Sequence, residues 1–582
     1  MAQSSQPSTK PVTGAAAILH ALEAAGITHL FVNLGSDHPA FLSAFAGRQF
    51  PKIRVFTSPN EMNALSAASG FAQLTGKPAA VLVHVECGTQ GLAGAVHNLA
   101  AEINSLTRYI HWIQDVPDQR AIVRQYMRYE HEIRRPQNAV QLVLRALQFV
   151  MSEPQGPAYL IASREVLEEE TDLTVPAIPS QDPSKTAALE PQGLGPASLD
   201  LLCTALLRAR KPLIVTSYLG RSKAGFEALR GFATLLAIPV HESAPIYNNF
   251  PTTSYLHQGH QWNGGGQLPA LAEADVVLVI DADVPWIPAQ SKPSPDAKVY
   301  HLDCDPLKEN TTLWSLPCEK RWKVDSATAL EQLAAAVRQS ALFGTEEIAA
   351  IVNERQTRLK ERFTERRARL ASVEEIPAAG NITVPYFMSR LREAASGVRV
   401  VGLNESTTNL GNVADHLHHD EPHSLIGSGG GALGWYSGGA VGASLALRSA
   451  GRQDDLVVAF TGDGTWLFGV PSCAYWMAKK YETPFLTVIW NNGGWGSPKN
   501  ACIRIHPEVA GAPVPEGRKL SDELMVSITP SPAFGKIAEG AGDAWWAQVT
   551  RAEGVDEACR EAIRVVREEK RSAVIEVVID SI

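Results

Sequence analysis

Short runs of apolar, often β-branched residues alternate with alanine-rich stretches of helical periodicity along most of the chain. Runs of this kind are typical of parallel strands that are buried on both faces, and the stretches between them are typical of covering helices. The pattern predicts an α/β chain of three doubly wound parallel-sheet domains. The clearest strand candidates are AAVLVHV (79–85), PLIVTS (212–217), DVVLVI (275–280), VRVVGL (398–403), DLVVAF (455–460), FLTVIW (485–490) and AVIEVVI (573–579).

Two polar stretches divide the chain into three blocks. Residues 173–196 are rich in Pro, Ser and Gln and predict an irregular linker, whereas residues 345–370 form a dense charged run that predicts a solvated helix. With 582 residues, the chain has room for several domains of ordinary size. We expect a disordered N-terminus (1–12), an N-terminal domain (13–180), a central Rossmann-like domain (195–340), a charged helical linker (345–372) and a C-terminal domain (380–582).

Charge and cysteine usage narrow the classes of partner. The formal net charge is only −9, and no cluster of Lys and Arg is interleaved with aromatic residues, which disfavours nucleic acid and acidic membranes. The seven cysteines are scattered and none forms a CxxC pair, which predicts reduced thiols and no zinc site. No apolar run reaches the length of about 18 residues that a spanning helix needs. We therefore expect a cytoplasmic protein that acts on a small molecule.

The sharpest chemical signal lies in the third block, at the ends of two expected strands. DLVVAF leads into TGDGT (461–465), and FLTVIW ends in NNGG (491–494). The carboxyl ends of neighbouring parallel strands meet at one edge of a sheet. Asp463, the amide of Asn492 and a nearby backbone carbonyl would offer the oxygen ligands that Mg²⁺ prefers.

A Mg²⁺ with about three protein ligands is usually completed by phosphate oxygens and water, so the motif implies a diphosphate. Gly462 and Gly464 allow backbone N–H groups to approach such a ligand. A helix that begins near Thr465 would add its positive end.

The 31 residues from Gly462 to Asn492 resemble the cofactor motif of thiamine-diphosphate-dependent decarboxylases and carboligases, which opens with GDG and closes with NN. The resemblance implies that Asp463, Asn492 and the backbone carbonyl of Gly494 hold Mg²⁺, and that Gly462, Gly464 and Thr465 lie against the diphosphate of thiamine diphosphate.

Two upstream segments, LNESTT (403–408) and GGGALGW (429–435), resemble the same family and benzoylformate decarboxylases in particular. By this match Thr407 and Thr408 help to hold the diphosphate. The carbonyl of Gly431 would accept a hydrogen bond from the aminopyrimidine, and Leu433 would wedge the cofactor into a bent shape.

The first block supplies the carboxylate that thiamine chemistry requires beside the pyrimidine ring, in a water-poor place. Glu61 follows an expected strand and opens a helix of small residues, and the segment 57–78 resembles the catalytic glutamate segment of the family. In the family the first block is the pyrimidine-binding domain and the third is the diphosphate-binding domain. The first block of one protomer faces the third block of another. The resemblance therefore implies a homodimer or homotetramer with active sites at the subunit interface.

Two further positions match benzoylformate decarboxylases. Ser36, in NLGSDH (33–38), falls on an active-site serine and would bind the substrate carboxylate. His84 falls on an active-site histidine and would move protons near neutral pH. A second catalytic histidine of these enzymes is replaced within residues 284–290, which leaves His257 and His260 as alternative proton donors.

Three functional hypotheses remain open. The chain is a lyase that cleaves 2-oxo acids to aldehydes and carbon dioxide, a carboligase of acetolactate synthase or benzaldehyde lyase type that adds the enamine intermediate to a second carbonyl, or an inactive regulatory homologue. Intact Glu61, Asp463 and Asn492 argue against the last. The middle block lacks a GxGxxG motif, so FAD or ADP there is possible but a domain without a nucleotide is favoured.

Overall fold

The computed structural model describes residues 12–47, 50–96, 116–171, 183–262, 266–309, 311, 315–377 and 380–582. The expected disordered N-terminus lies outside the described residues except for Val12, which belongs to a short strand, and much of the expected linker 173–196 lies outside them too. Among the described helices, none is both long and apolar enough to cross a membrane.

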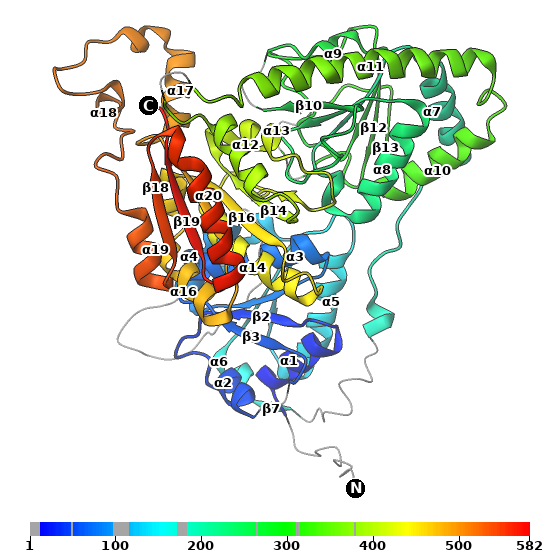
Figure 1. The fold of residues 1–582 in the computed structure, drawn as a ribbon. Helices are drawn as coiled ribbons and strands as arrows, with labels where there is room; N and C mark the ends of the chain where they lie inside the picture. Colours follow the sequence, from blue (N-terminus) through cyan, green and yellow to red (C-terminus); the bar gives the residue numbers. More distant parts are fainter. Residues whose placement is uncertain are drawn as a thin grey trace.

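Residues 12–171 form the amino-terminal unit, at the bottom of Figure 1. Its parallel strands form sheets of order β3-β2-β4 and β5-β6, and β1 pairs with β7. The strands are β1 (Val12–Thr13), β2 (His29–Val32), β3 (Arg54–Thr57), β4 (Ala80–Leu82), β5 (Tyr129–Ile133), β6 (Ala158–Ala162) and β7 (Glu170–Thr171). The helices are α1 (Gly14–Ala24), α2 (Pro39–Ala46), α3 (Glu61–Thr75), α4 (Val85–Val96), α5 (Ala139–Met151) and α6 (Arg164–Glu168).

The strand expected over 79–85 is shorter than its apolar run suggests. Strand β4 ends at Leu82, and helix α4 begins at Val85. The backbone N–H of Val85 donates to Asp37 Oδ2 at 3.1 Å, so a carboxylate from a distant loop satisfies the first turn of the helix.

The middle unit contains one parallel sheet of order β10-β9-β8-β11-β12-β13. Its strands are β8 (Pro212–Thr216), β9 (Val240–Ser243), β10 (His257–Gln261), β11 (Val276–Ile280), β12 (Lys298–Asp303) and β13 (Lys320–Lys323). Its helices are α7 (Pro196–Arg208), α8 (Lys223–Leu236), α9 (Pro269–Glu273) and α10 (Ser326–Gln339).

The carboxyl-terminal unit contains a second parallel sheet, of order β15-β14-β16-β17-β19-β18. Its strands are β14 (Val400–Glu405), β15 (Leu425–Ile426), β16 (Leu456–Gly462), β17 (Leu486–Asn491), β18 (Trp545–Val549) and β19 (Ala573–Val578). Its helices are α12 (Val384–Ala394), α13 (Leu410–Leu417), α14 (Trp435–Ser449), α15 (Asp463–Phe468), α16 (Pro471–Tyr481), α17 (Gly496–Ile505), α18 (Leu520–Glu523), α19 (Phe534–Gly542) and α20 (Val555–Arg564). The expected α/β class of parallel-sheet units is confirmed.

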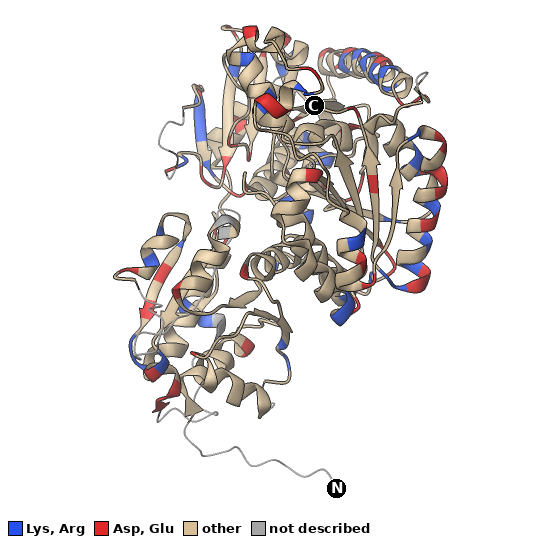
Figure 2. Cartoon of the chain, turned by 90° about the vertical axis from the view of Figure 1, so that its left-hand side faces the viewer, with Lys and Arg blue, Asp and Glu red and all other residues tan. Residues whose placement is uncertain are grey.

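The charged run at 345–370 forms the long helix α11 (Glu346–Ser372), which crosses the top of Figure 1. Acidic and basic residues are otherwise intermixed over the three units (Figure 2). The expectation of a fully solvated helix was wrong, because Ile348, Ile351 and Leu359 are buried against the middle unit. One face of the helix therefore packs on the core of the middle unit, and the opposite face is exposed to solvent.

Arg355 of α11 is buried and donates to the backbone carbonyls of Leu206, Leu207, Ala209 and Leu236, where α7 and α8 end. Burial lowers the pKa of Arg355 to about 10, which still leaves it charged at neutral pH. One guanidinium thus satisfies carbonyls at the ends of two helices.

Arg355→Met is expected to lower the free energy of unfolding by about 3 kcal/mol, because the substitution leaves several buried carbonyls without a donor. Urea unfolding followed by circular dichroism measures the effect. Arg369→Met, on the exposed side of α11, is the matched control. Equal unfolding midpoints for the two variants would contradict the assigned role of Arg355.

A buried ionic network joins the middle unit to the carboxyl-terminal unit. Glu242 Oε2 lies 3.0 Å from His257 Nε2 and 2.8 Å from His260 Nε2, and His260 Nδ1 lies 3.0 Å from Asp415 Oδ1. Arg366 of α11 also pairs with Asp415, at 2.7 Å. Burial disfavours charge on His260, but its two carboxylate partners outweigh burial and raise its pKa to about 9. Both His257 and His260 are engaged in this network with buried side chains, and a role for either as a proton donor to substrate stays a prediction.

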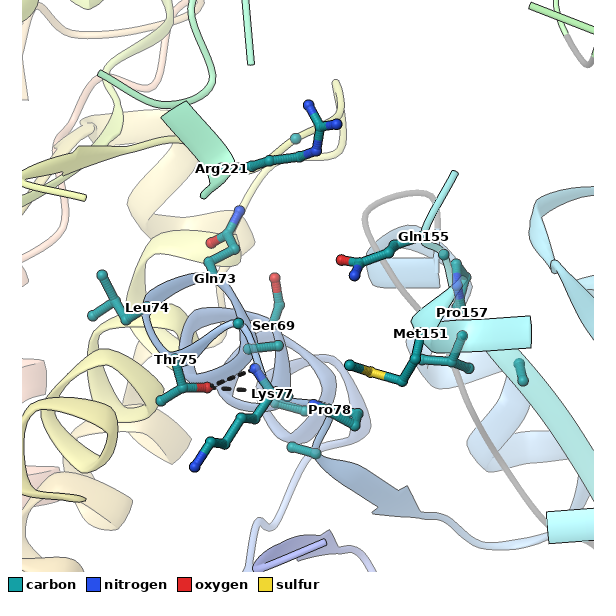
Figure 3. Close-up of a pocket in the computed structure, with 18 of the residues that line it drawn as sticks. Ser69, Gln73, Leu74, Thr75, Lys77, Pro78, Met151, Gln155, Pro157 and Arg221 are labelled. Atoms are coloured by element: carbon teal, nitrogen blue, oxygen red, sulfur yellow. Dashed lines mark hydrogen bonds between the residues drawn. The ribbon is translucent and has the colours of Figure 1, made fainter. Parts of the chain in front are cut away.

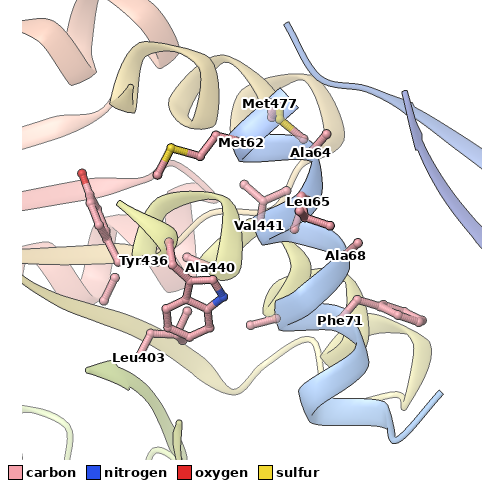
Figure 4. Close-up of a cluster of buried hydrophobic side chains, with 14 of the residues drawn as sticks. Met62, Ala64, Leu65, Ala68, Phe71, Leu403, Tyr436, Ala440, Val441 and Met477 are labelled. Carbon is pink, nitrogen blue, oxygen red and sulfur yellow. The ribbon is translucent and has the colours of Figure 1, made fainter. Parts of the chain in front are cut away.

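The amino-terminal and carboxyl-terminal units meet where helices α3 and α14 cross (Figure 4). Both helices are rich in small residues, so their backbones touch. A Cβ added to Gly70 would collide with the backbone of Gly439, and one added to Gly442 would collide with the carbonyl of Ala67. This contact sets the position of the residue that opens α3.

Candidate active site

Glu61 is the first residue of α3 and is half-buried. The helix is capped by Asn60, whose side chain accepts from the N–H of Asn63. Asn33 Nδ2 donates to Glu61 Oε1 at 2.8 Å. Gly88 and Gly91 of α4 lie against the same carboxylate, since a Cβ on either would lie within 3.3 Å of one of its oxygens. Glu61 is therefore held by an amide and faced by bare backbone, which leaves little room for water.

Hydrogen bonds tie the start of α3 to the loop between α15 and α16. Asn63 Nδ2 donates to the carbonyls of Gly469 and Val470, each at 3.3 Å, and the hydroxyl of Ser437 donates to Asn63 Oδ1 at 3.1 Å. Burial and the negative charge of Glu61 both raise the pKa of Cys473, which places Glu61 electrostatically beside α16. The expectation that Glu61 faces the third block of another protomer stays a prediction. Within the chain itself, the start of α3 contacts the loop before α16, because the small-residue faces of α3 and α14 pack directly.

The acidic turn and the amide turn lie together at the carboxyl edge of neighbouring strands β16 and β17. Asp463 is buried, and its Oδ1 accepts from the N–H of Gly464 at 2.8 Å. The amide turn is closed by Asn492 Oδ1, which accepts from the N–H of Gly494 at 3.2 Å. Burial raises the pKa of Asp463 to about 6, although the N–H groups of Gly464, Gly493 and Gly494 pull it down. The two turns therefore face each other as the motif spacing predicted.

These residues fit a hard divalent cation. Asp463 Oδ2 is buried without a hydrogen-bond partner among the described residues, and a buried carboxylate oxygen without a partner is costly unless a cation or a donor meets it. Asn492 and the carbonyl of Gly494 add neutral oxygens of the kind that Mg²⁺ accepts. The ring of Trp495 covers Gly464, where a Cβ would lie 2.5 Å from it. The turn could thus hold a metal against a diphosphate only with glycine at this position.

The remaining expected cofactor residues lie around this edge with differing exposure. Helix α15 begins at Asp463, so Thr465 lies in its first turn and is buried. Thr407 and Thr408 are exposed. Thr408 Cγ2 and Asn492 Nδ2 both lie beside Gly496, since a Cβ added there would be 3.4 Å from each of them. Gly462 ends β16 and caps α15.

Gly431 is exposed and Leu433 is half-buried in the irregular segment that leads into α14. Gly434 follows with φ +95°, and a Cβ there would lie 2.6 Å from Met62 Cε, next to Glu61. The segment expected to hold the pyrimidine therefore adjoins the residue expected to activate it.

His84 belongs to a second cluster, beside Glu61. Its Nδ1 lies 2.6 Å from Asp37 Oδ1. That hydrogen bond raises the pKa of His84 despite partial burial, and the charges of Asp37, Glu61 and Glu86 add to the effect. Ser36 is exposed one residue before Asp37, and its carbonyl accepts from Arg164 Nη1 at 3.3 Å. The predicted serine and histidine are thus adjacent, joined by an aspartate.

Asp37→Asn is expected to lower the pKa of His84, because the neutral amide no longer stabilises the imidazolium. A raised pKa keeps His84 protonated to higher pH, so its loss moves the alkaline limb of the pH profile of kcat/KM to lower pH. Steady-state kinetics over a pH series measures the shift. Asp118→Asn, an exposed carboxylate of the same unit, should leave the profile in place, and an unshifted Asp37→Asn profile would argue against this coupling.

Sequence reasoning missed Asn33 and Asp37 as functional residues, although both lie in the NLGSDH segment. Their only signal was proximity to Ser36, since their partners lie 28 and 47 residues away. Trp466 is fully buried, and its ring meets Phe534 in a T-shaped contact with the ring centroids 5.2 Å apart. It therefore supports α15 from the core.

A separate cavity of about 1500 Å³ lies between the three units (Figure 3). Its walls include Gln73 and Lys77 near the end of α3, Met151 at the end of α5, and Arg221 of the middle unit. None of the predicted catalytic or metal residues lines it. The cavity adjoins the edge between β8 and β11, where Rossmann-like sheets bind ligands.

Comparisons with known proteins agree with this geometry. Residues 12–106 match the model of the N-terminal TPP binding domain of thiamine pyrophosphate enzymes, and residues 406–577 match the model of the C-terminal TPP binding domain. The chain is 25% identical over 513 residues to benzoylformate decarboxylase of Pseudomonas aeruginosa, covering 84% of this chain and 88% of that protein. It is 23% identical over 514 residues to acetolactate synthase of Bacillus subtilis, covering 82% and 81%.

The fold is shared with the crystal structure of benzoylformate decarboxylase from Polynucleobacter necessarius, with a TM-score of 0.76, 19% identity, and coverage of 98% of this chain and 99% of that one. The chain therefore contains both the N-terminal and the C-terminal TPP binding domain of the thiamine pyrophosphate enzymes, and its relatives include decarboxylases and acetolactate synthases.

Proposed function

We propose that the chain uses thiamine diphosphate and Mg²⁺ to decarboxylate 2-oxo acids. The observation that carries the proposal is the contact of α3 with α14, which sets Glu61 beside the unit that holds the Asp463 and Asn492 turns. The benzoylformate decarboxylase relative supports this reaction class. A 2-oxo acid would enter beside Ser36 and His84.

The roles of the side chains follow from their surroundings. When bound, thiamine diphosphate supplies a thiazolium that stabilises negative charge on the substrate carbon. Asp463, Asn492 and the carbonyl of Gly494 would hold the metal. Glu61 would share a proton with the pyrimidine ring of the bound cofactor, and Asn33 keeps its carboxylate in place. His84 exchanges protons with substrate, and Ser36 binds the substrate carboxylate.

Carboligation is the second candidate, since the chain also resembles acetolactate synthase. The test is incubation of the purified protein, thiamine diphosphate and Mg²⁺ with pyruvate, with benzoylformate and with benzaldehyde, followed by product identification. An aldehyde with carbon dioxide supports decarboxylation, whereas a hydroxyketone product supports ligation. Absence of turnover with every substrate in a protein that binds the cofactor would support an inactive homologue instead.

We propose that the middle unit works without FAD. At the β8–β11 edge, Arg221 pairs with Asp281 at 2.6 Å, and Lys308 pairs with Asp303 at 3.0 Å and Asp283 at 2.8 Å. Basic side chains that already have carboxylate partners are poorly placed to receive a nucleotide phosphate. Flavin absorption in the protein as purified would contradict the proposal.

We also propose that the chain forms a homodimer or homotetramer. Leu467 (40% exposed), Phe468 (53%) and Val470 (36%) present apolar surface directly after the metal-binding turn. Clustered apolar side chains of this kind are typical of interfaces, and a second copy would cover them and the edge of the site. Light scattering coupled to size-exclusion chromatography tests the assembly, and a monomer at micromolar concentration would contradict it.

A further inference from the structure

Glu405 is a buried carboxylate for which the proposed reaction has no direct use. It is the last residue of β14, it is 5% exposed, and it forms no salt bridge with any of the described residues. Its Oε2 accepts from the N–H of Tyr436 at 2.9 Å, and its Oε1 accepts from the N–H of Trp435 at 3.3 Å. These are the first two residues of α14. Glu405 therefore caps a helix from a neighbouring strand.

The helix cannot supply this cap from its own N-cap position. Gly434 has φ +95°, and a Cβ there would lie 2.5 Å from Gly469 Cα. A Ser, Thr or Asp at that position would collide with the loop, so the N–H groups at the start of α14 need an acceptor from elsewhere. Burial raises the pKa of Glu405 to about 8, although the N–H groups of Gly434, Trp435 and Tyr436 lower it. The fold therefore keeps a carboxyl group that is costly to bury at the start of this helix.

The two ends of this interaction lie in the two segments expected to grip the cofactor. Glu405 is followed by Ser406, Thr407 and Thr408, whereas Trp435 is preceded directly by Gly431 to Gly434. Thr407 itself has φ +45°, a conformation that costs free energy outside glycine and needs support from its surroundings. One side chain thus links the strand end that faces the diphosphate to the segment that faces the pyrimidine.

We propose that Glu405 is a positioning residue that holds the 431–434 segment in register with Thr407 and Thr408, so that its loss weakens thiamine diphosphate binding beyond any loss of folding stability. The inference rests on the proposed function of the site. Among the described residues, Glu405 has no side-chain hydrogen bond or ion pair with Glu61 or with the expected metal ligands, and it acts through the backbone of α14.

The test measures the binding of thiamine diphosphate to the full-length Glu405→Gln variant in the presence of Mg²⁺. Quenching of tryptophan fluorescence reports the binding, so the measurement does not depend on turnover. The glutamine replaces one acceptor oxygen with an NH₂ group that faces a backbone N–H. We expect the Kd to rise about tenfold, as for the loss of one buried hydrogen bond. Urea unfolding of the apoprotein is measured in parallel.

Glu242→Gln is the matched control, because Glu242 is also fully buried and accepts a backbone N–H, from Asn249 at 2.6 Å, but lies in the middle unit. It should lower stability and leave the Kd of the cofactor unchanged. Equal Kd values for wild type and Glu405→Gln would overturn the inference alone. A wild-type chain that binds no thiamine diphosphate would overturn the proposed function and this inference with it.

Glu405→Asp serves if the glutamine variant does not fold. The aspartate keeps the carboxyl group but is one methylene shorter, so it cannot reach both N–H groups. We expect a folded protein with a Kd between those of the wild type and a chain without the cap. Wild-type affinity in Glu405→Asp would show that the bridge to α14 is not needed for binding, which would overturn the inference.

Discussion

Glu61→Gln is expected to lower kcat by about a thousandfold, the range in which loss of a positioned proton-transfer group falls. Glutamine keeps the shape and can still accept from Asn33, which donates to Glu61 Oε1 at 2.8 Å. It cannot share a proton with the pyrimidine ring, so the cofactor would bind but remain unactivated. Steady-state kinetics with whichever 2-oxo acid is turned over measures kcat, and fluorescence titration measures the Kd of thiamine diphosphate.

The expected signature is a large loss in kcat with a Kd close to that of the wild type. Glu168→Gln, an exposed glutamate of α6 in the same unit, is the control and should match the wild type in both measurements. A Glu61→Gln enzyme with undiminished kcat would show that another group activates the cofactor. That result would remove Glu61 from the mechanism without affecting the metal site.

Asp463→Asn is expected to raise the Kd of thiamine diphosphate by about 100-fold in the presence of Mg²⁺, since the site loses its only anionic metal ligand. The same substitution should leave the apoprotein at least as stable as the wild type. Asp463 Oδ2 is buried without a partner among the described residues, and burial of a neutral amide costs less than burial of a carboxylate. Differential scanning fluorimetry with and without cofactor and Mg²⁺ separates the two effects.

The wild type should melt at a higher temperature with cofactor and metal than without them, and Asp463→Asn should lose most of that increment. Asp454→Asn, an exposed aspartate shortly before β16, should keep the full increment. Retention of the increment by Asp463→Asn would place the metal elsewhere. A melting temperature of the apo variant far below that of the wild type would instead identify Asp463 as a structural residue.

The carboxyl-terminal site was the most predictable part of the molecule, for a physical reason. Strands β16 and β17 are buried on both faces, so they read as uninterrupted apolar runs, and the chemistry begins where the runs stop. Asp463 and Asn492 follow those strands directly in the chain. Their meeting at one sheet edge needs only that the strands be parallel neighbours, which the pattern itself predicted.

Residues whose roles depend on a partner far along the chain could not be predicted. Asp37 reaches His84 across 47 residues, and Glu405 reaches Trp435 across 30. Neither distance has a period in the sequence, and both contacts arise only after the sheets and helices have packed. The contact of His257 and His260 with Glu242 could not be predicted for the same reason, because the sequence does not show which side chain faces a histidine.

The hidden side of α11 shows a related limit. A dense run of charged residues in a helix normally predicts a solvated helix. Arg355 nevertheless lies in the core, because four backbone carbonyls there accept hydrogen bonds from its guanidinium. Only the positions of Leu206 and Leu236, on helices that precede α11 by more than a hundred residues, explain its burial.

The backbone contact between α3 and α14 limits how the substrate preference of this enzyme can evolve. Where Gly70 meets Gly439 and Gly442 meets Ala67, no flexible side chain separates the two backbones. The distance from Glu61 to the turns of Asp463 and Asn492 is therefore fixed by contact between two backbones. A larger side chain at the crossing would lengthen this distance, but no substitution could shorten it. New substrate preferences would have to arise from substitutions around Ser36 and His84. Substitutions at the helix crossing would instead move Glu61 away from the cofactor.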